Sequence, residues 1–172
     1  MYATGELSHE IVAFGLIKAP ADDIWPIDGF VPNVIPPIVR SDHMFMMDAS
    51  EICLHPSIFN ILHVSNRWER QIAQREPHLT DVPKELPAGD TVAIILLSDN
   101  GRITESIKQI RTNVDVIRGI QLNDEGTHMV VVGQEGSGVE IYELGGERGD
   151  VWTLATGLNE RLETGLKHAV RL

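Results

Sequence analysis

A repeated pair of strands is the feature that most restricts how this chain can fold. Residues 5–14 align without a gap on residues 133–142, and apolar residues match apolar residues at the strand positions. A third copy, residues 64–68, fills the same position, because it also ends an apolar strand that follows a short inner strand and a turn. Self-similarity on this scale is typical of solenoids and propellers. The chain is therefore predicted to be a tandem array of β-units.

Each complete unit contains four short apolar runs separated by turn residues such as Asn-Gly. The predicted strands of the two complete units cover residues 52–54, 61–64, 91–97, 103–110, 117–122, 129–132, 139–144 and 151–156. Four meandering strands in each unit favour a propeller blade, since solenoid coils rarely carry so many. We predict an all-β fold, a partial β-propeller of about two and a half four-stranded antiparallel blades.

The whole chain, 1–172, is predicted to form a single partial propeller domain. Its predicted parts are 1–48, the outer part of a blade with a proline-rich insertion; 49–114, a second blade with an insertion at 75–90; and 115–172, a third blade with a C-terminal segment. Prolines in the insertions remove backbone donors that a strand ladder needs. Leucines four residues apart after position 157 indicate a helix or a closing strand over 158–172.

Charge and composition restrict the partners. The formal net charge is -11 and no cluster of Lys or Arg occurs, so nucleic acid and anionic membrane surfaces would be repelled. No apolar run approaches the ~18 residues of a membrane span. A lone cysteine, Cys53, lies in an apolar strand and fits a reducing compartment. These features predict a cytoplasmic protein that binds small molecules or other proteins.

The position shared by the three copies holds Glu6, Arg67 and Gln134, each predicted just past the end of an apolar strand. Equivalent positions of successive blades converge around the propeller axis, so these side chains are expected at one mouth of the channel. Arg118, predicted just ahead of an inner strand, could face the same channel, and Asn66 precedes Arg67. Arg can bind a carboxylate through two hydrogen bonds, and Glu can move a proton. The alternative is a structural ion pair between Glu6 and Arg67, or solvated loop charges.

Other site chemistries lack their patterns. None of the seven histidines forms a pair with the spacing of a zinc motif, so no metal ligand set is predicted. The glycine-rich stretch 133–138 lacks the Lys and the helix of a phosphate-binding loop and is predicted to be a hairpin. No serine lies in a nucleophile elbow. We therefore expect no cofactor.

Several motifs resemble the lactonase-type seven-bladed β-propellers, which include bacterial 6-phosphogluconolactonase and the fungal carboxy-cis,cis-muconate cyclases. The motifs that carry the resemblance lie, in the order of the family, at residues 5–8, 10–14, 51–56, 64–67, 123–126 and 130–132. The proline-rich insertions look more like those of the fungal branch. The resemblance covers most of this chain, but only the C-terminal portion of the family's ring.

The resemblance implies a metal-free enzyme that interconverts a small carboxylated lactone and its open-chain acid, as a lactone hydrolase or a muconate cyclase of the isomerase class. It implies that Glu6 donates or accepts a proton and that Arg67 binds the substrate carboxylate. From their own positions near the predicted channel, we predict Gln134, Arg118 and Asn66 as substrate-binding residues. A His and a further Arg that the family takes from earlier blades have no counterpart here.

Three readings of this partial ring remain open. The chain could be a truncated form with an incomplete active site. It could self-associate through exposed blade faces to complete a ring. It could also be a non-catalytic β-propeller module for protein interaction that kept the scaffold and lost the chemistry.

Overall fold

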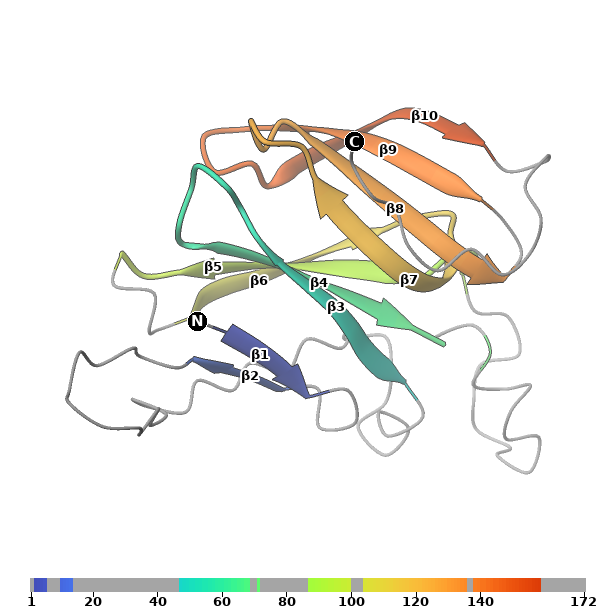
Figure 1. Cartoon of the computed structure of the whole chain (residues 1–172), viewed down its shortest axis with the longest axis horizontal. Helices are drawn as coiled ribbons and strands as arrows, with labels where there is room; N and C mark the ends of the chain where they lie inside the picture. Colours follow the sequence, from blue (N-terminus) through green and yellow to red (C-terminus); the bar gives the residue numbers. More distant parts are fainter. Residues whose placement is uncertain are drawn as a thin grey trace.

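The computed structural model describes residues 2–5, 10–13, 47–68, 71, 87–99, 104–135 and 138–158. Within these ranges all regular elements are β-strands, arranged in three antiparallel sheets (Figure 1). The strands are β1 (Tyr2–Gly5), β2 (Glu10–Ala13), β3 (Asp48–Leu54), β4 (Ile61–Arg67), β5 (Thr91–Leu97), β6 (Thr104–Arg111), β7 (Asp115–Leu122), β8 (His128–Glu135), β9 (Val139–Gly145) and β10 (Val151–Leu158). The predicted all-β, partial-propeller fold is confirmed.

The sheets follow the chain without crossovers. β1 pairs with β2, the middle sheet has the order β3-β4-β5-β6, and the last sheet has the order β7-β8-β9-β10. In Figure 1 the arrowheads of β1, β4 and β8 all point toward the lower right of the view, as the repeat in the sequence requires. Each four-stranded sheet is therefore one blade, with β3 and β7 as equivalent first strands.

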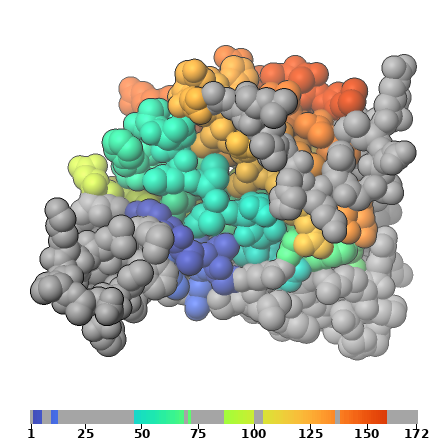
Figure 2. Space-filling view, viewed as in Figure 1, coloured from blue at the N-terminus to red at the C-terminus, as the bar shows by residue number. Residues whose placement is uncertain are grey.

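The middle sheet is covered on both faces. Every residue of β4 and β5 is buried. Leu62 and Val64 pack with Ile11 of β2 on one face, whereas Ile61 and Ile94 pack on the other face near Trp152 of β10. Figure 2 shows the blue atoms of the first sheet against the cyan atoms of β3. A strand buried on both faces reads as a continuous apolar run, which explains the sequence of 91–97.

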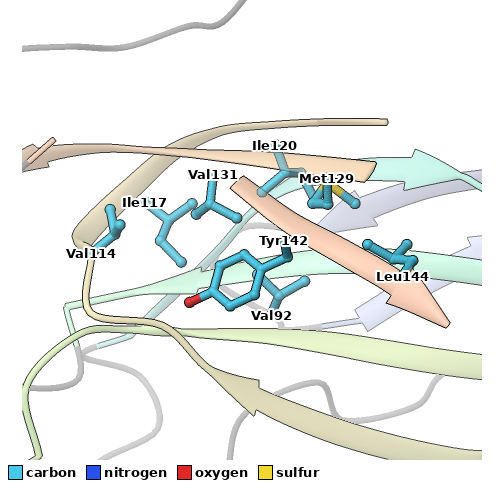
Figure 3. Close-up of a cluster of buried hydrophobic side chains, with 8 residues drawn as sticks. All are labelled: Val92, Val114, Ile117, Ile120, Met129, Val131, Tyr142 and Leu144. Atoms are coloured by element: carbon cyan, nitrogen blue, oxygen red, sulfur yellow. The ribbon is translucent and has the colours of Figure 1, made fainter. Parts of the chain in front are cut away.

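The seam between the middle and last sheets has its own apolar cluster. Val92 of β5 lies there among side chains from β7, β8 and β9, and the Tyr142 ring points into the cluster (Figure 3). Its buried members are Val92, Val114, Ile117, Ile120, Met129, Val131, Tyr142 and Leu144. This contact fixes the position of one blade relative to the next.

His55 joins the two blades at one end of this seam. Its Nε2 lies 3.0 Å from the carbonyl oxygen of Gly126, in the turn between β7 and β8. Its Nδ1 accepts hydrogen bonds from the backbone N–H groups of Ser57 and Ile58. The imidazole therefore shapes its own turn and also contacts the neighbouring blade.

Several predicted strands are longer in the structure. β3 begins at Asp48 rather than residue 52, and β7 begins at Asp115 rather than residue 117. The apolar pattern missed these ends because Asp48 pairs with Arg67, and Asp115 with Glu135, at polar strand termini. As a correction, Arg67 is the last residue of β4, Gln134 lies inside β8, and Arg118 lies inside β7 rather than ahead of it.

The remaining predictions are only partly covered by the described residues. Most of both insertions, and residues 159–172 of the predicted helix or closing strand, lie outside them, and Leu158 ends β10. Among the described residues no helix is long and apolar enough to span a membrane. Val151, Leu154 and Leu158 of β10 are exposed apolar side chains. Self-association, the domain boundaries and the cytoplasmic location stay predictions.

Candidate functional site

Polar side chains gather where β4 and β8 end and where β3 and β7 begin. We define the arginine site as Asp48, Arg67, Asp90, Arg118 and Gln134. These residues come from both sides of the seam between the middle and last blades. The register places them together because the first strand of each blade begins beside the end of the second strand.

Arg67 is only 6% exposed. Its Nε donates a hydrogen bond of 3.3 Å to Oδ2 of Asp48, the residue directly opposite on β3. Charge-assisted pairs of this kind orient a guanidinium group. The ion pair fixes the end of β4 within its own blade.

Arg118 lies at an irregularity of the ladder between β7 and β8, between Ile117 and Gly119. Its Nε donates a short hydrogen bond of 2.6 Å to Oε1 of Gln134 on β8. A register irregularity re-aims the side chain that it carries. The structure thus joins two predicted substrate-binding residues directly, and the Gln134 amide orients the Arg118 guanidinium group.

The two arginines influence each other across the seam. Burial and the positive charge of Arg118 together lower the pKa of Arg67 to about 10, while Asp90 opposes both effects. Two like charges this close repel each other unless an anion lies nearby. Asp48 and Asp90 supply such negative charges within the site, so a negatively charged ligand would share the two guanidinium groups with these carboxylates.

Asn66 is fully buried, and its Nδ2 donates to Oγ1 of Thr91 on β5. Successive residues of a strand point to opposite faces, so Asn66 and Arg67 project from opposite faces of β4. The hydrogen bond shows a role in holding β4 to β5. Substrate binding by Asn66 stays a prediction.

Asp90 was missed by reasoning from the sequence. It is fully buried, immediately ahead of β5, and its Oδ2 accepts hydrogen bonds from the backbone N–H groups of Trp68 and Val116. The sequence does contain a signal for this residue: Asp90 directly precedes the continuous apolar run of β5. A carboxylate next to a strand that is buried along its whole length is expected to be buried too, and it then needs hydrogen-bond donors. The predicted insertion 75–90 had included it.

Glu6 lies outside the described residues, so its predicted place beside Arg67 and its proton-transfer role stay predictions. The ion pair between Arg67 and Glu6 also stays a prediction, and one partner of Arg67 among the described residues is Asp48. Among the described residues no three His, Cys, Asp or Glu side chains are grouped so that they could hold a metal ion.

A hollow of about 220 Å³ lies at the opposite ends of β3 and β7. It is lined by Cys53, Leu54, Pro56, Ile120, Gln121, Leu122, Asn123 and Asp124, and shares no residue with the arginine site. Burial raises the pKa of the Cys53 thiol to about 11, and the Leu122 backbone opposes this in part. The thiol at this hollow is therefore protonated at neutral pH.

Solved structures with similar folds include proteins from three bacteria. A periplasmic gluconolactonase of Pseudomonas aeruginosa matches with a TM-score of 0.68 and 12% identity, over 99% of this chain and 38% of its own. A Lactobacillus plantarum protein matches with a TM-score of 0.64 and 19% identity, over 96% of this chain and 38% of its own. A putative 6-phosphogluconolactonase of Bacteroides fragilis matches with a TM-score of 0.60 and 15% identity, over 90% and 34%.

No protein-family model and no curated protein matches the sequence. At most 38% of the length of these three structures is covered, so the similarity extends to part of their fold. Because the sequence identities are low, the matches speak for the fold and not for the chemistry. The chain has the fold of part of a lactonase-type β-propeller, as its motifs predicted.

Proposed function

We propose that the arginine site binds the acidic group of a small carboxylated lactone and that the site supports hydrolysis of this lactone to its open-chain acid. The observation that carries the proposal is the approach of Arg67 and Arg118 across the blade seam, which lowers the pKa of Arg67. An anion between two guanidinium groups would relieve their repulsion. Planar guanidinium groups also match the geometry of a carboxylate.

The orientation of Arg118 supports the same assignment. Its Nε is engaged by Gln134, and in the described part of the chain its terminal nitrogens have no protein hydrogen-bond acceptor. Those terminal donors are available to a carboxylate or to a carbonyl oxygen. Arg67 instead uses its Nε to hold Asp48, so both side chains are oriented before a ligand arrives.

In the proposed reaction, water attacks the lactone carbonyl carbon and gives one proton to a general base. The carbonyl oxygen becomes an oxyanion, which a guanidinium group stabilises in a site with little water. The ring C–O bond then breaks, and the leaving oxygen takes up a proton to give the hydroxy acid. We assign the base to Glu6, on the strength of its equivalent position after β1.

The direction of the reaction is proposed from the similar structures. Two of them are a periplasmic gluconolactonase and a putative 6-phosphogluconolactonase, which favours hydrolysis over the cyclisation of a muconate. In hydrolysis the negative charge develops on the lactone carbonyl oxygen, whereas in cyclisation a carboxylate adds to a conjugated alkene and the adjacent carbon takes up a proton; in both reactions a guanidinium group can stabilise the developing negative charge. Muconate cyclase activity is therefore the alternative within this proposal. Comparing the turnover of the different substrates distinguishes the two activities.

The test is a proton-release assay on the purified chain with glucono-δ-lactone, 6-phosphogluconolactone and a carboxylated muconolactone, each measured against its uncatalysed hydrolysis. We expect turnover of at least one of the two lactones that carry an acidic group, and for that lactone a loss of roughly 100-fold or more in kcat/KM for Arg67→Ala and Arg118→Ala. Glu6→Gln is expected to lower kcat more than it raises KM.

Arg148→Ala is the matched control. Arg148 is another arginine of the described residues, but it pairs with Glu105 at the surface rather than with the arginine site. The same change of net charge should leave the turnover unchanged. A wild-type rate equal to the background for all three lactones refutes the proposal, as does full activity of the Arg67 variant.

A further inference from the structure

We propose that Asp90 is the positioning residue of the arginine site: its buried carboxylate fixes the two backbone segments that carry Arg67 and Arg118, and its negative charge holds the two guanidinium groups together. This inference rests on the proposed function in so far as it names these arginines as the ligand-binding groups. Asp90 touches no substrate atom in this scheme and acts through the arginines.

One oxygen atom links the two blades at this point. Oδ2 of Asp90 accepts a hydrogen bond of 3.2 Å from the N–H of Trp68 and one of 2.7 Å from the N–H of Val116. Trp68 directly follows Arg67 at the end of β4. Val116 lies two residues before Arg118 near the start of β7. The same carboxylate oxygen therefore sets where both arginine-bearing strands meet.

The backbone at both contacts is strained. Trp68 has φ = 75° and Val116 has φ = 54°, and they are the two non-glycine residues with positive φ in the described ranges. This conformation is especially unfavourable for a β-branched residue such as Val116. Strain of this kind persists only where surrounding contacts impose it, and it concentrates at functional sites. Both strained residues donate to Asp90, so this carboxylate is the shared contact.

Asp90 is itself held firmly. Its N–H donates to the carbonyl of Val114 at 2.8 Å, and its own carbonyl accepts from the N–H and Oγ1 of Thr112 at 3.0 and 2.9 Å. Gly89 precedes it with φ = 77°, and a Cβ there would lie 1.9 Å from the Thr112 carbonyl oxygen. The close packing of these backbones holds the Asp90 backbone in one position.

The charge of Asp90 adds to this geometry. Asp48 on β3, Arg118 on β7 and Asp90 ahead of β5 are the charged groups identified near Arg67. Asp90 raises the pKa of Arg67 against the lowering by burial and by Arg118. Removal of the charge should therefore lower the pKa of Arg67 below about 10.

Asp90→Asn tests the charge, because its amide oxygen can still accept both backbone hydrogen bonds. Glu140→Gln is the matched control. Glu140 is also fully buried, and its carboxylate accepts from the N–H and Nδ2 of Asn113 and from the Tyr142 hydroxyl. It is not among the charges that affect Arg67. Both variants remove a buried charge at the seam, but only one removes it from the arginine site.

Two measurements are made on each full-length protein: the pH profile of kcat/KM for the lactone turned over by the wild type, and the binding of inorganic phosphate by calorimetry. For Asp90→Asn we expect the alkaline limits of kcat/KM and of phosphate binding, the latter measured at several pH values from 7 upwards, to move down by about one pH unit, whereas phosphate affinity at pH 7 should not fall, because Arg67 is still protonated there. For Glu140→Gln we expect both to stay as in the wild type, whatever the loss in thermal stability.

The outcomes separate this inference from the proposed function. Turnover by the wild type, with the same alkaline limits in Asp90→Asn, overturns the role of Asp90 alone. Phosphate binding whose alkaline limit moves down in Asp90→Asn but not in Glu140→Gln, in a protein without lactone turnover, supports the role of Asp90 while the proposed reaction fails. Equal effects of the two variants, or no phosphate binding by the wild type, overturn the positioning role.

Discussion

Acidification is expected to destabilise the blade seam through one buried histidine, His63. This side chain is fully buried on β4, and neither ring nitrogen makes a hydrogen bond of good geometry with the described residues. Burial and, to a smaller extent, the charge of His55 lower its pKa to about 3, against a smaller opposite effect from the Cys53 backbone. The folded protein therefore holds His63 neutral over a range in which the unfolded chain protonates it.

The sign and size of the effect follow from proton linkage. Between the unfolded pKa of 6.5 and the folded value of about 3, the unfolded state binds one more proton, so the free energy of unfolding falls as the pH falls. Over the whole window this amounts to about 5 kcal/mol, and from pH 7 to pH 5 to about 2 kcal/mol. Below pH 3 His63 is protonated in both states, so this contribution to the free energy of unfolding changes no further. His55, whose pKa is also lowered by burial, contributes with the same sign.

The perturbation is His63→Leu, which keeps a similar volume and removes the titrating group. Urea unfolding at pH 7 and pH 5 can be followed by tryptophan fluorescence, because the Trp152 ring lies 5.6 Å from the His63 ring across the seam. We expect the variant to lose about 2 kcal/mol less stability than the wild type between these two pH values.

The control and the refuting result are both measured as changes with pH. His128→Leu removes an exposed histidine of β8 and is expected to keep the wild-type dependence. The groups around His63 that also ionise are Cys53 on β3, His55 after β3 and, near Trp152, Tyr142 on β9. Equal losses of stability in His63→Leu and in the wild type would refute the reasoning, because the acid sensitivity would then come from another group.

Two further predictions concern the same seam. Gly126 has φ = 71°, and in Gly126→Ala the new Cβ would lie 2.2 Å from the His55 ring, so we expect chemical denaturation to show a loss of about 2–4 kcal/mol in the free energy of unfolding. In the control Gly145→Ala the nearest neighbour of the new Cβ lies at 3.7 Å, so the loss should be much smaller. Equal losses in the two variants would contradict the argument. Burial raises the pKa of Cys53 to about 11. We therefore expect iodoacetamide at pH 8 to alkylate this thiol about 100-fold more slowly in the folded chain than in the urea-unfolded chain. Similar rates in the two states would show an accessible thiolate.

The strand order was open to prediction because it depends on local alternation. Buried strands such as β5 read as continuous apolar runs, and the repeat between 5–14 and 133–142 fixes which strands are equivalent. Arg67 and Gln134 were found for the same reason, since both occupy the end of the second strand of their blade. The pattern of residues along a single strand is therefore sufficient to predict the strand order and the positions of these two side chains.

The rest of the arginine site depends on contacts between blades, which no periodicity encodes. Asp48 lies opposite Arg67 only because β3 extends four residues beyond its apolar run. The positive φ of Val116 and its hydrogen bond to Asp90 are consequences of how the last blade docks on the middle one. Arg118 lies at a register irregularity between β7 and β8, and nothing in the neighbouring residues Ile117 and Gly119 predicts this irregularity.

The acid-sensitive histidine and the arginine site share one strand face, and this couples stability to function. Alternate residues of a strand point to the same side, so His63 and Arg67 both project from β4 toward the last blade. His63 contacts Trp152 there, and Arg67 lies near Arg118 there. A proton on His63 would thus loosen the same seam that aligns the two guanidinium groups. Loss of ligand binding at low pH should therefore begin before global unfolding, and His63→Leu should delay both.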